Sequence, residues 1–122
     1  VRDAAQIMNE AGTGSVLVEV GGQVVGIFTE RDLMRRVVAA DKLPGATTVG
    51  DVMTTALVTA RPDATLADCG QLMSERRIRH LPVFDGEEVI GIVTTGDLLA
   101  HELAEKSAKI QHLEDFVFYT RS

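Results

Sequence analysis

The sequence contains no tryptophan, one tyrosine and one cysteine among its 122 residues. A single cysteine, Cys69, excludes an internal disulfide and suits a reducing compartment. Its place in a helical pattern indicates a small core residue rather than a redox or nucleophilic group. The start of the chain has neither signal-peptide nor transit-peptide character, and no apolar run approaches the roughly 20 residues that cross a bilayer. We therefore expect a cytoplasmic chain without a membrane span.

Basic residues are also scarce, since 12 Lys and Arg stand against 18 Asp and Glu and give a net charge of −6. Nucleic acids and anionic membranes are bound through Lys and Arg, so this balance argues against both as partners. Catalysis has little support. No P-loop or serine-centred elbow occurs, and His80, His101 and His112 do not have zinc-ligand spacing. We predict no enzyme activity, no metal site and no required cofactor.

What the sequence does contain is a tandem repeat. With an offset of 65 positions, residues 1–38 align with residues 66–103 without a gap. Twelve of these 38 pairs are identical, where composition alone gives roughly two or three. The identities include the pairs Gly26/Gly91, Thr29/Thr94 and Asp32/Asp97. Because turn glycines and helix starts recur together with apolar positions, the repeat duplicates an architecture that shares one modest core.

Each repeat has the pattern helix, strand, strand, helix. In the first repeat the spacing predicts a helix over 1–11 ended by Gly12, strands over 16–20 and 24–28 around Gly21-Gly22, and a helix over 30–40. In the second repeat it predicts a helix over 66–77 capped by Thr65 and Asp68, strands over 81–84 and 89–93 around Asp85-Gly86, and a helix over 95–108.

The residues between the repeats predict a linker over 41–47, one helical turn with a Thr48/Asp51 capping box, and a short strand over 57–60. The first repeat has no counterpart of that strand, so we expect residues upstream of Val1. We assign 1–46 to an N-terminally incomplete first repeat with its linker, 47–108 to the second repeat, and 109–122 to a C-terminal tail. The apolar residues of the tail predict docking on the domain or on a second copy.

The two Thr-x-x-Asp elements, Thr29/Asp32 and Thr94/Asp97, allow two interpretations. Such an element at a helix start is a capping box, in which the Thr hydroxyl binds a free N–H and the Asp reaches back. The same place also suits a ligand, because a helix N-terminus attracts phosphate and a carboxylate accepts the hydroxyl protons of a ribose. Occurrence in both repeats favours the second interpretation without excluding the first.

These elements, together with Asp51-Val-Met-Thr54 and Arg79-His80-Leu81-Pro82-Val83 between them, resemble a tandem pair of cystathionine-β-synthase (CBS) domains, also called a Bateman module. The resemblance covers about residues 1–108. It implies an α/β (α+β) fold of two β-α-β-β-α repeats that pack through their sheets with pseudo-two-fold symmetry. It also implies two clefts that bind adenine nucleotides or S-adenosylmethionine, in which the Asp holds the ribose hydroxyls and the Thr lies near phosphate.

Carried over residue by residue, the resemblance predicts that one cleft contains Thr29, Arg31, Asp32, Thr54, Thr59, Ile78, Arg79 and His80. The other is predicted to contain Thr94, Asp97, Gly14 and Ser15. Arg31 stands where the second repeat has Gly96, which favours polyphosphate binding beside Asp32.

The resulting prediction is a regulatory sensor that binds an adenine nucleotide of the AMP, ADP or ATP type and signals occupancy through conformation or dimer arrangement to an unknown effector protein. A homodimer is expected from amphipathic helices and from the resemblance. The alternatives are a dimerisation or scaffold module without a ligand, a module for S-adenosylmethionine or NAD, and a weak nucleotide-processing enzyme.

Overall fold

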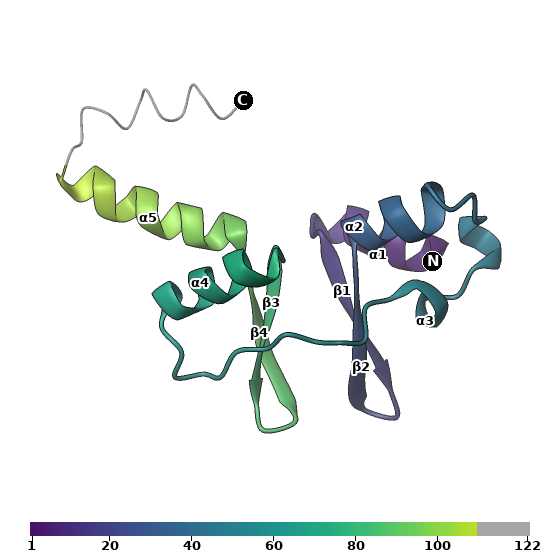
Figure 1. Ribbon diagram of the computed structural model, residues 1–122, viewed down its shortest axis with the longest axis horizontal. Helices are drawn as coiled ribbons and strands as arrows, with labels where there is room; N and C mark the ends of the chain where they lie inside the picture. The colour runs from purple at the N-terminus through teal and green to yellow at the C-terminus, as the bar shows by residue number, and fades with distance from the viewer. Residues whose placement is uncertain (110–122) are drawn as a thin grey trace. The chain divides into compact units, whose positions relative to one another are not determined.

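The computed structural model describes residues 1–109, which form a mixed α/β fold of helices and two hairpins (Figure 1). In chain order the elements are α1 (Arg2–Ala11), β1 (Ser15–Val20), β2 (Gln23–Thr29), α2 (Glu30–Asp32), the π-helical η1 (Leu33–Val38), the 3-10 turn η2 (Pro44–Ala46), α3 (Val49–Val52), α4 (Leu66–Arg76), β3 (His80–Asp85), β4 (Glu88–Thr94) and α5 (Thr95–Lys109). This order confirms the predicted fold class.

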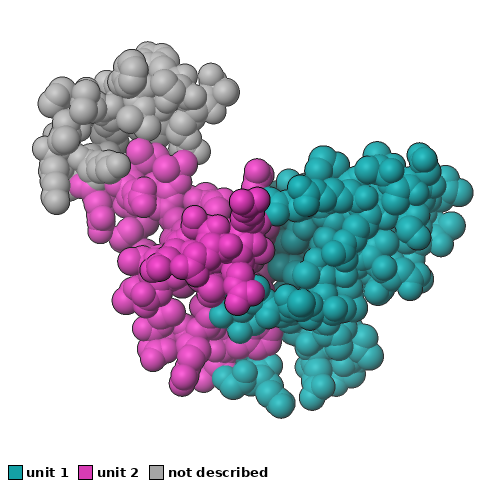
Figure 2. All heavy atoms as spheres, viewed as in Figure 1, with its two compact units in different colours: residues 1–59, 86–89 teal, residues 60–85, 90–122 magenta. Residues whose placement is uncertain are grey.

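Two compact units make up the described chain (Figure 2). Unit 1 contains residues 1–59 and 86–89, and unit 2 contains residues 60–85 with the chain from residue 90. The repeat boundaries predicted from the sequence stay predictions, and all of the predicted tail except Lys109 lies outside the described residues. Within the described part of the chain, every helix is too short or too polar to span a bilayer.

The hairpin of unit 1 has the register that its glycines predict. Gly21 and Gly22 both have positive φ, 60° and 82°, as a two-residue turn between antiparallel strands requires. The pairing runs from Ser15 opposite Thr29 to Val20 opposite Gln23, with a shift of register at Val18/Glu19. The hairpin therefore ends beside the first Thr-x-x-Asp element.

The core of unit 1 lies where α1, β2, η1 and α3 meet. Its buried members are Met8, Phe28, Val37 and Val52. Phe28 and Val37 have no solvent exposure. These residues come from four separate elements, so the α2–η1 segment and α3 are both fixed against the hairpin.

The helix predicted over residues 30–40 begins correctly but changes its winding. After one α-helical turn the chain forms η1, where the N–H of Ala39 donates to the carbonyl oxygen of Met34 at 2.8 Å. This i→i−5 bond encloses one more residue than an α-helical turn. The corresponding α5 of the second repeat is α-helical over its 15 residues, so the two repeats differ directly after their Asp residues.

Unit 2 contains α4, β3, α5 and the part of β4 from residue 90 onward, while residues 86–89, which include the turn between β3 and β4, belong to unit 1. Helix α4 begins with the predicted capping box, since Asp68 N donates to Thr65 Oγ1 at 3.1 Å and Thr65 N donates to Asp68 Oδ2 at 3.4 Å. It ends at Arg77, whose φ of 55° is left-handed. Cys69 is buried, in agreement with its predicted core role.

Two predictions for the connecting segment were wrong. Thr48 does not form a side-chain capping box with Asp51, because the N–H of Asp51 donates to the Thr48 carbonyl oxygen at 3.2 Å instead. The expected strand over residues 57–60 is reduced to one parallel bridge, in which Ala60 N donates to Pro82 O and Phe84 N donates to Ala60 O, each at 2.9 Å. The helical turn itself, α3, is present.

Candidate functional site

The first Thr-x-x-Asp element forms a complete capping box at the start of α2. Thr29 N donates to Asp32 Oδ2 at 3.1 Å, and Asp32 N donates to Thr29 Oγ1 at 3.2 Å. The element forms here because β2 ends at Thr29 in an extended conformation and the next three residues are helical. The capping interpretation of Thr29 and Asp32 is therefore confirmed.

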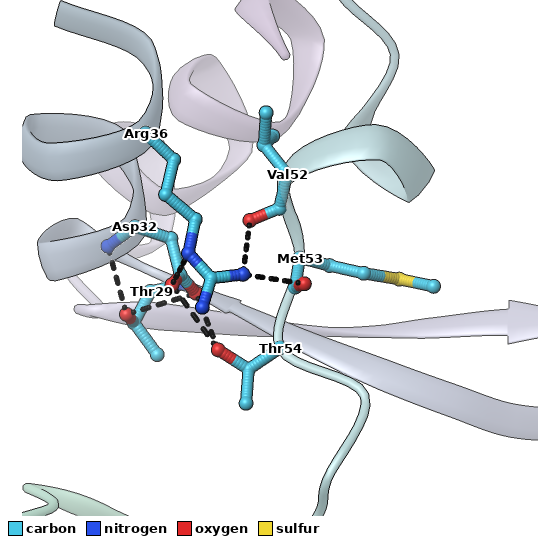
Figure 3. A network of polar contacts seen from close by, with 6 residues as sticks. All are labelled: Thr29, Asp32, Arg36, Val52, Met53 and Thr54. Atoms are coloured by element: carbon cyan, nitrogen blue, oxygen red, sulfur yellow. Dashed lines mark hydrogen bonds and ion pairs between the residues drawn. The ribbon is translucent and has the colours of Figure 1, made fainter. Parts of the chain in front are cut away.

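The carboxylate of Asp32 is also the centre of a larger network (Figure 3). Thr29 Oγ1 lies 3.2 Å from Asp32 Oδ2, and Thr54 Oγ1 lies 3.2 Å from Oδ2 and 3.1 Å from Oδ1. Asp32 is only 6% exposed. The structure thus brings two predicted site residues, Thr29 and Thr54, to the buried carboxylate of a third, Asp32, and their hydrogen bonds compensate for its burial.

A residue that the sequence analysis did not select completes this network. Arg36 Nε lies 3.7 Å from Asp32 Oδ1, while its Nη1 donates to the carbonyl oxygens of Met53 at 3.0 Å and Val52 at 3.4 Å (Figure 3). Those carbonyls end α3, where a helix carries partial negative charge. Arg36 therefore connects the carboxylate to the segment that carries Thr54.

The sequence held a signal for Arg36 in its spacing. It stands four residues after Asp32, where opposite charges on a helix meet. The corresponding residue of the second repeat is His101, which lies 3.1 Å from Glu105 Oε1 instead.

The second Thr-x-x-Asp element forms the same box with fewer donors. Thr94 N donates to Asp97 Oδ2 at 2.9 Å, and Asp97 N donates to Thr94 Oγ1 at 3.1 Å. Asp97 is exposed, in contrast to Asp32. The two carboxylates therefore occupy equivalent positions in the repeats but differ in burial and in the donors around them.

Equivalent backbone hydrogen bonds lie beside the two capping boxes, one in each repeat. Glu30 N donates to Gly14 O at 3.0 Å, and Thr95 N donates to Arg79 O at 3.1 Å. Gly14 and Arg79 are themselves repeat counterparts. Each of them lies at or just before the start of its hairpin, so both predicted site residues are fixed beside a helix start.

The remaining predicted residues are distributed over the two units. Ser15, which is buried, and Thr59, which is exposed, lie in unit 1 with Arg31. Ile78, Arg79 and His80 lie at the entrance to β3 in unit 2. Because each predicted cleft combines residues of both units, the two clefts stay predictions.

Metal chemistry gains no support from the described residues. Across residues 1–109, His, Cys, Asp and Glu do not gather in groups of three or more that could hold a metal ion. The donors around Asp32 are hydroxyls, an amide and a guanidinium, a set that complements a carboxylate rather than a cation. A carboxylate in such a setting can accept hydrogen bonds from the hydroxyl groups of a ligand.

The comparisons with known proteins identify the class. The family model "CBS domain" matches residues 1–39 and 49–104. The chain belongs to the CBS-domain family and carries the repeat twice.

Among its relatives is the CBS domain-containing protein YhcV of Bacillus subtilis, which is 36% identical over 108 residues, covering 88% of this chain and 76% of YhcV. Among solved structures, a protein with CBS domains from Burkholderia ambifaria MC40-6 is 41% identical, with a TM-score of 0.82 over 85% of this chain and 76% of that one.

Two solved structures of similar proteins hold adenosine compounds. CBSX2 in complex with AMP is 31% identical, with a TM-score of 0.71 over 87% of this chain and 83% of that one. The CBS domain pair of MJ0100, in complex with 5-methylthioadenosine and S-adenosyl-L-methionine, is 29% identical, with a TM-score of 0.74 over 86% of this chain and 82% of that one. Ligand binding is thus known for close structural relatives of this chain.

Proposed function

We propose that this chain is a regulatory module that binds an adenine nucleotide and signals its occupancy through conformation or dimer arrangement. The observation that carries the proposal is the structural likeness to CBSX2 in complex with AMP. A ligand shifts such a module only by binding one of its states better than the other. The module itself would carry no chemistry, and the protein that responds to it is a separate partner.

In this proposal the two Asp residues hold the ribose. A carboxylate has about four lone-pair sites, so a capping bond does not exhaust it. Asp97 is exposed and uses Oδ2 for the Thr94 N–H. Asp32 receives donors on both oxygens, and a ribose there has to replace one of them.

The phosphoryl oxygens would contact the basic residues of the predicted clefts, Arg31, Arg79 and His80. Charged donors form the stronger hydrogen bonds to phosphate. Gly14, Ser15, Thr54, Thr59 and Ile78 would line the clefts around the base and sugar. We propose the cytoplasm as the location, where a buried and unpaired Cys69 stays reduced.

A dimerisation module without a ligand is the second candidate. It is favoured by one observation: Thr65/Asp68 forms the same capping box in a place where no ligand is predicted. Capping alone therefore explains the local geometry of all three boxes. A module for S-adenosylmethionine or NAD is a third candidate, and the ligands of MJ0100 support S-adenosylmethionine.

A melting screen with AMP, ADP, ATP, NAD and S-adenosylmethionine separates these candidates. A ligand at about 100 times its dissociation constant adds roughly 2.7 kcal/mol to the free energy of unfolding. We expect a shift with at least one adenine nucleotide, a smaller shift in Asp32→Ala or Asp97→Ala, and an unchanged shift in Asp68→Ala. Asp68→Ala is the matched control because it removes a capping box of the same type. The absence of a shift with every compound would leave the dimerisation module.

A further inference from the structure

Asp32 already accepts two hydroxyl donors from its own chain. The hydroxyls belong to Thr29 and Thr54, at 3.2 Å from Oδ2 and at 3.1 Å from Oδ1 respectively (Figure 3). A ribose presents the same chemistry to a carboxylate, namely two neighbouring hydroxyl groups that donate to its oxygens. Hydroxyl groups of the chain therefore donate to the Asp32 carboxylate in the way that the ribose hydroxyls of the proposed ligand would.

Thr54 holds this position through its main chain. Ile27 N donates to Thr54 O at 2.9 Å and Thr54 N donates to Ile27 O at 2.8 Å. The approach to β2 is close, since a Cβ built on Gly26 would lie 2.9 Å from the Thr54 carbonyl oxygen. The backbone of Thr54 is thus fixed next to Asp32, and only its side chain can turn away.

Arg36 strengthens the same contact from the other side. Its Nη1 binds the carbonyl oxygens of Val52 and Met53, the two residues before Thr54, and its Nε lies 3.7 Å from Asp32 Oδ1. Asp32 and Arg36 both belong to the segment after β2, while Thr54 follows α3. The three side chains thus join two segments around one carboxylate.

We propose that Thr54 is a built-in competitor for the sugar-binding carboxylate Asp32. This proposal rests on the proposed function and adds a regulatory contact to it. A ribose reaches Asp32 only when the Thr54 hydroxyl gives up its bond, which lowers the apparent affinity there. Asp97 is exposed, and the donor to its carboxylate in the described structure is a backbone N–H, so the second repeat lacks this competition. The ligand consequently fills the Asp97 site first.

The test measures AMP binding by calorimetry in an Asp97→Ala background, so that only the Asp32 site is observed. Thr54→Val removes the hydroxyl and keeps the branched shape, and we expect it to tighten AMP binding about tenfold, the size of one net hydrogen bond. Thr54→Ala removes the same hydroxyl and should show the same direction. Thr54→Ser keeps the hydroxyl and should stay within about threefold of the parent.

A ligand without the diol supplies the second control. Binding of 2′,3′-dideoxy-AMP does not compete with the Thr54 hydroxyl, so Thr54→Val should leave it unchanged. A general structural effect of the substitution would change the affinity for both ligands to the same extent. Tighter binding of AMP alone supports the competitor.

The outcomes distinguish this inference from the proposed function. Weaker or unchanged AMP binding in Thr54→Val and Thr54→Ala overturns the proposal that Thr54 competes with the ligand, but it does not contradict the proposed sensor function. Weaker binding would indicate that Thr54 contacts the ligand. A further outcome also overturns the competitor. In that outcome the unmodified chain binds AMP, the Asp97→Ala variant does not, and none of the Thr54 substitutions restores binding in that background. If the unmodified chain binds none of the adenosine compounds, the proposed function fails and the competitor fails with it.

Discussion

Replacement of Asp32 by alanine should destabilise the fold much more than the same replacement of Asp68. Asp32 accepts the capping N–H and two threonine hydroxyls in a site that is 6% exposed. Each hydroxyl bond to a carboxylate contributes about 1.5 kcal/mol, and the cap about 1 kcal/mol. The half-exposed ion pair with Arg36 adds little. Asp32→Ala should therefore cost about 3 to 4 kcal/mol of unfolding free energy.

Asp68 provides the internal comparison for that figure. It is exposed and accepts only the Thr65 N–H among the described bonds, at 3.4 Å, so Asp68→Ala should cost about 1 kcal/mol or less. The two variants should differ by about 2 to 3 kcal/mol in urea unfolding followed by circular dichroism, or by roughly 10 °C in melting temperature. A difference below about 0.5 kcal/mol would refute the network, because it would reduce Asp32 to an ordinary cap.

Three further substitutions, one of them with a matched control, test the surroundings of the site and the core beside it. Gly26→Ala should lower the free energy of unfolding in urea by about 2 to 3 kcal/mol, because its Cβ would lie 2.9 Å from Thr54 O. The control Gly91→Ala meets nothing within 4 Å and should change that free energy by no more than about 0.5 kcal/mol. Equal costs would contradict the close approach of Thr54 to β2. Phe28→Ala should cost about 3 to 5 kcal/mol, since its side chain is 0% exposed, and a melting temperature near that of the parent would contradict the assignment of the core. Arg36→Met should cost about 1 kcal/mol by the same measurement, and a gain in stability would show that its carbonyl contacts do not hold the segment.

The sequence predicted most elements because the repeat supplied each signal twice. Glycines at both hairpin turns and capping residues at three helix starts act locally, over two to four residues, so their effects follow from spacing alone. The hairpins and the helices on both sides of each hairpin were found within a few residues of their observed ends.

The wrong predictions concern backbone groups for which more than one hydrogen-bond partner was available. At Thr48 a backbone carbonyl accepts the N–H that the side chain was expected to accept. The strand at residues 57–60 depended on a neighbour far away in sequence, and only Ala60 finds one, in Val83. The helix after Thr29 was predicted, but its change to π-helical winding in η1 was not.

Three residues of the network around Asp32 could be selected from the sequence, but the connections between them could not, and the two predicted clefts stay predictions. Thr29, Asp32 and Thr54 were selected together, and the structure places them in one network. The contribution of Arg36 depends on where α3 ends, because its partners are backbone carbonyls of Val52 and Met53. Every residue has a backbone carbonyl, so residue types alone do not predict which carbonyl Arg36 binds. This contact could be identified only in the folded structure.

The most direct test of the sensor is a calorimetric titration of AMP into four forms of the chain. These are the unmodified chain, Asp68→Ala, Thr54→Val and the double variant Asp32→Ala/Asp97→Ala. The account predicts binding by the first three and loss of binding, by at least about a hundredfold, in the folded double variant. Undiminished binding by the double variant would show that the two carboxylates do not hold the nucleotide.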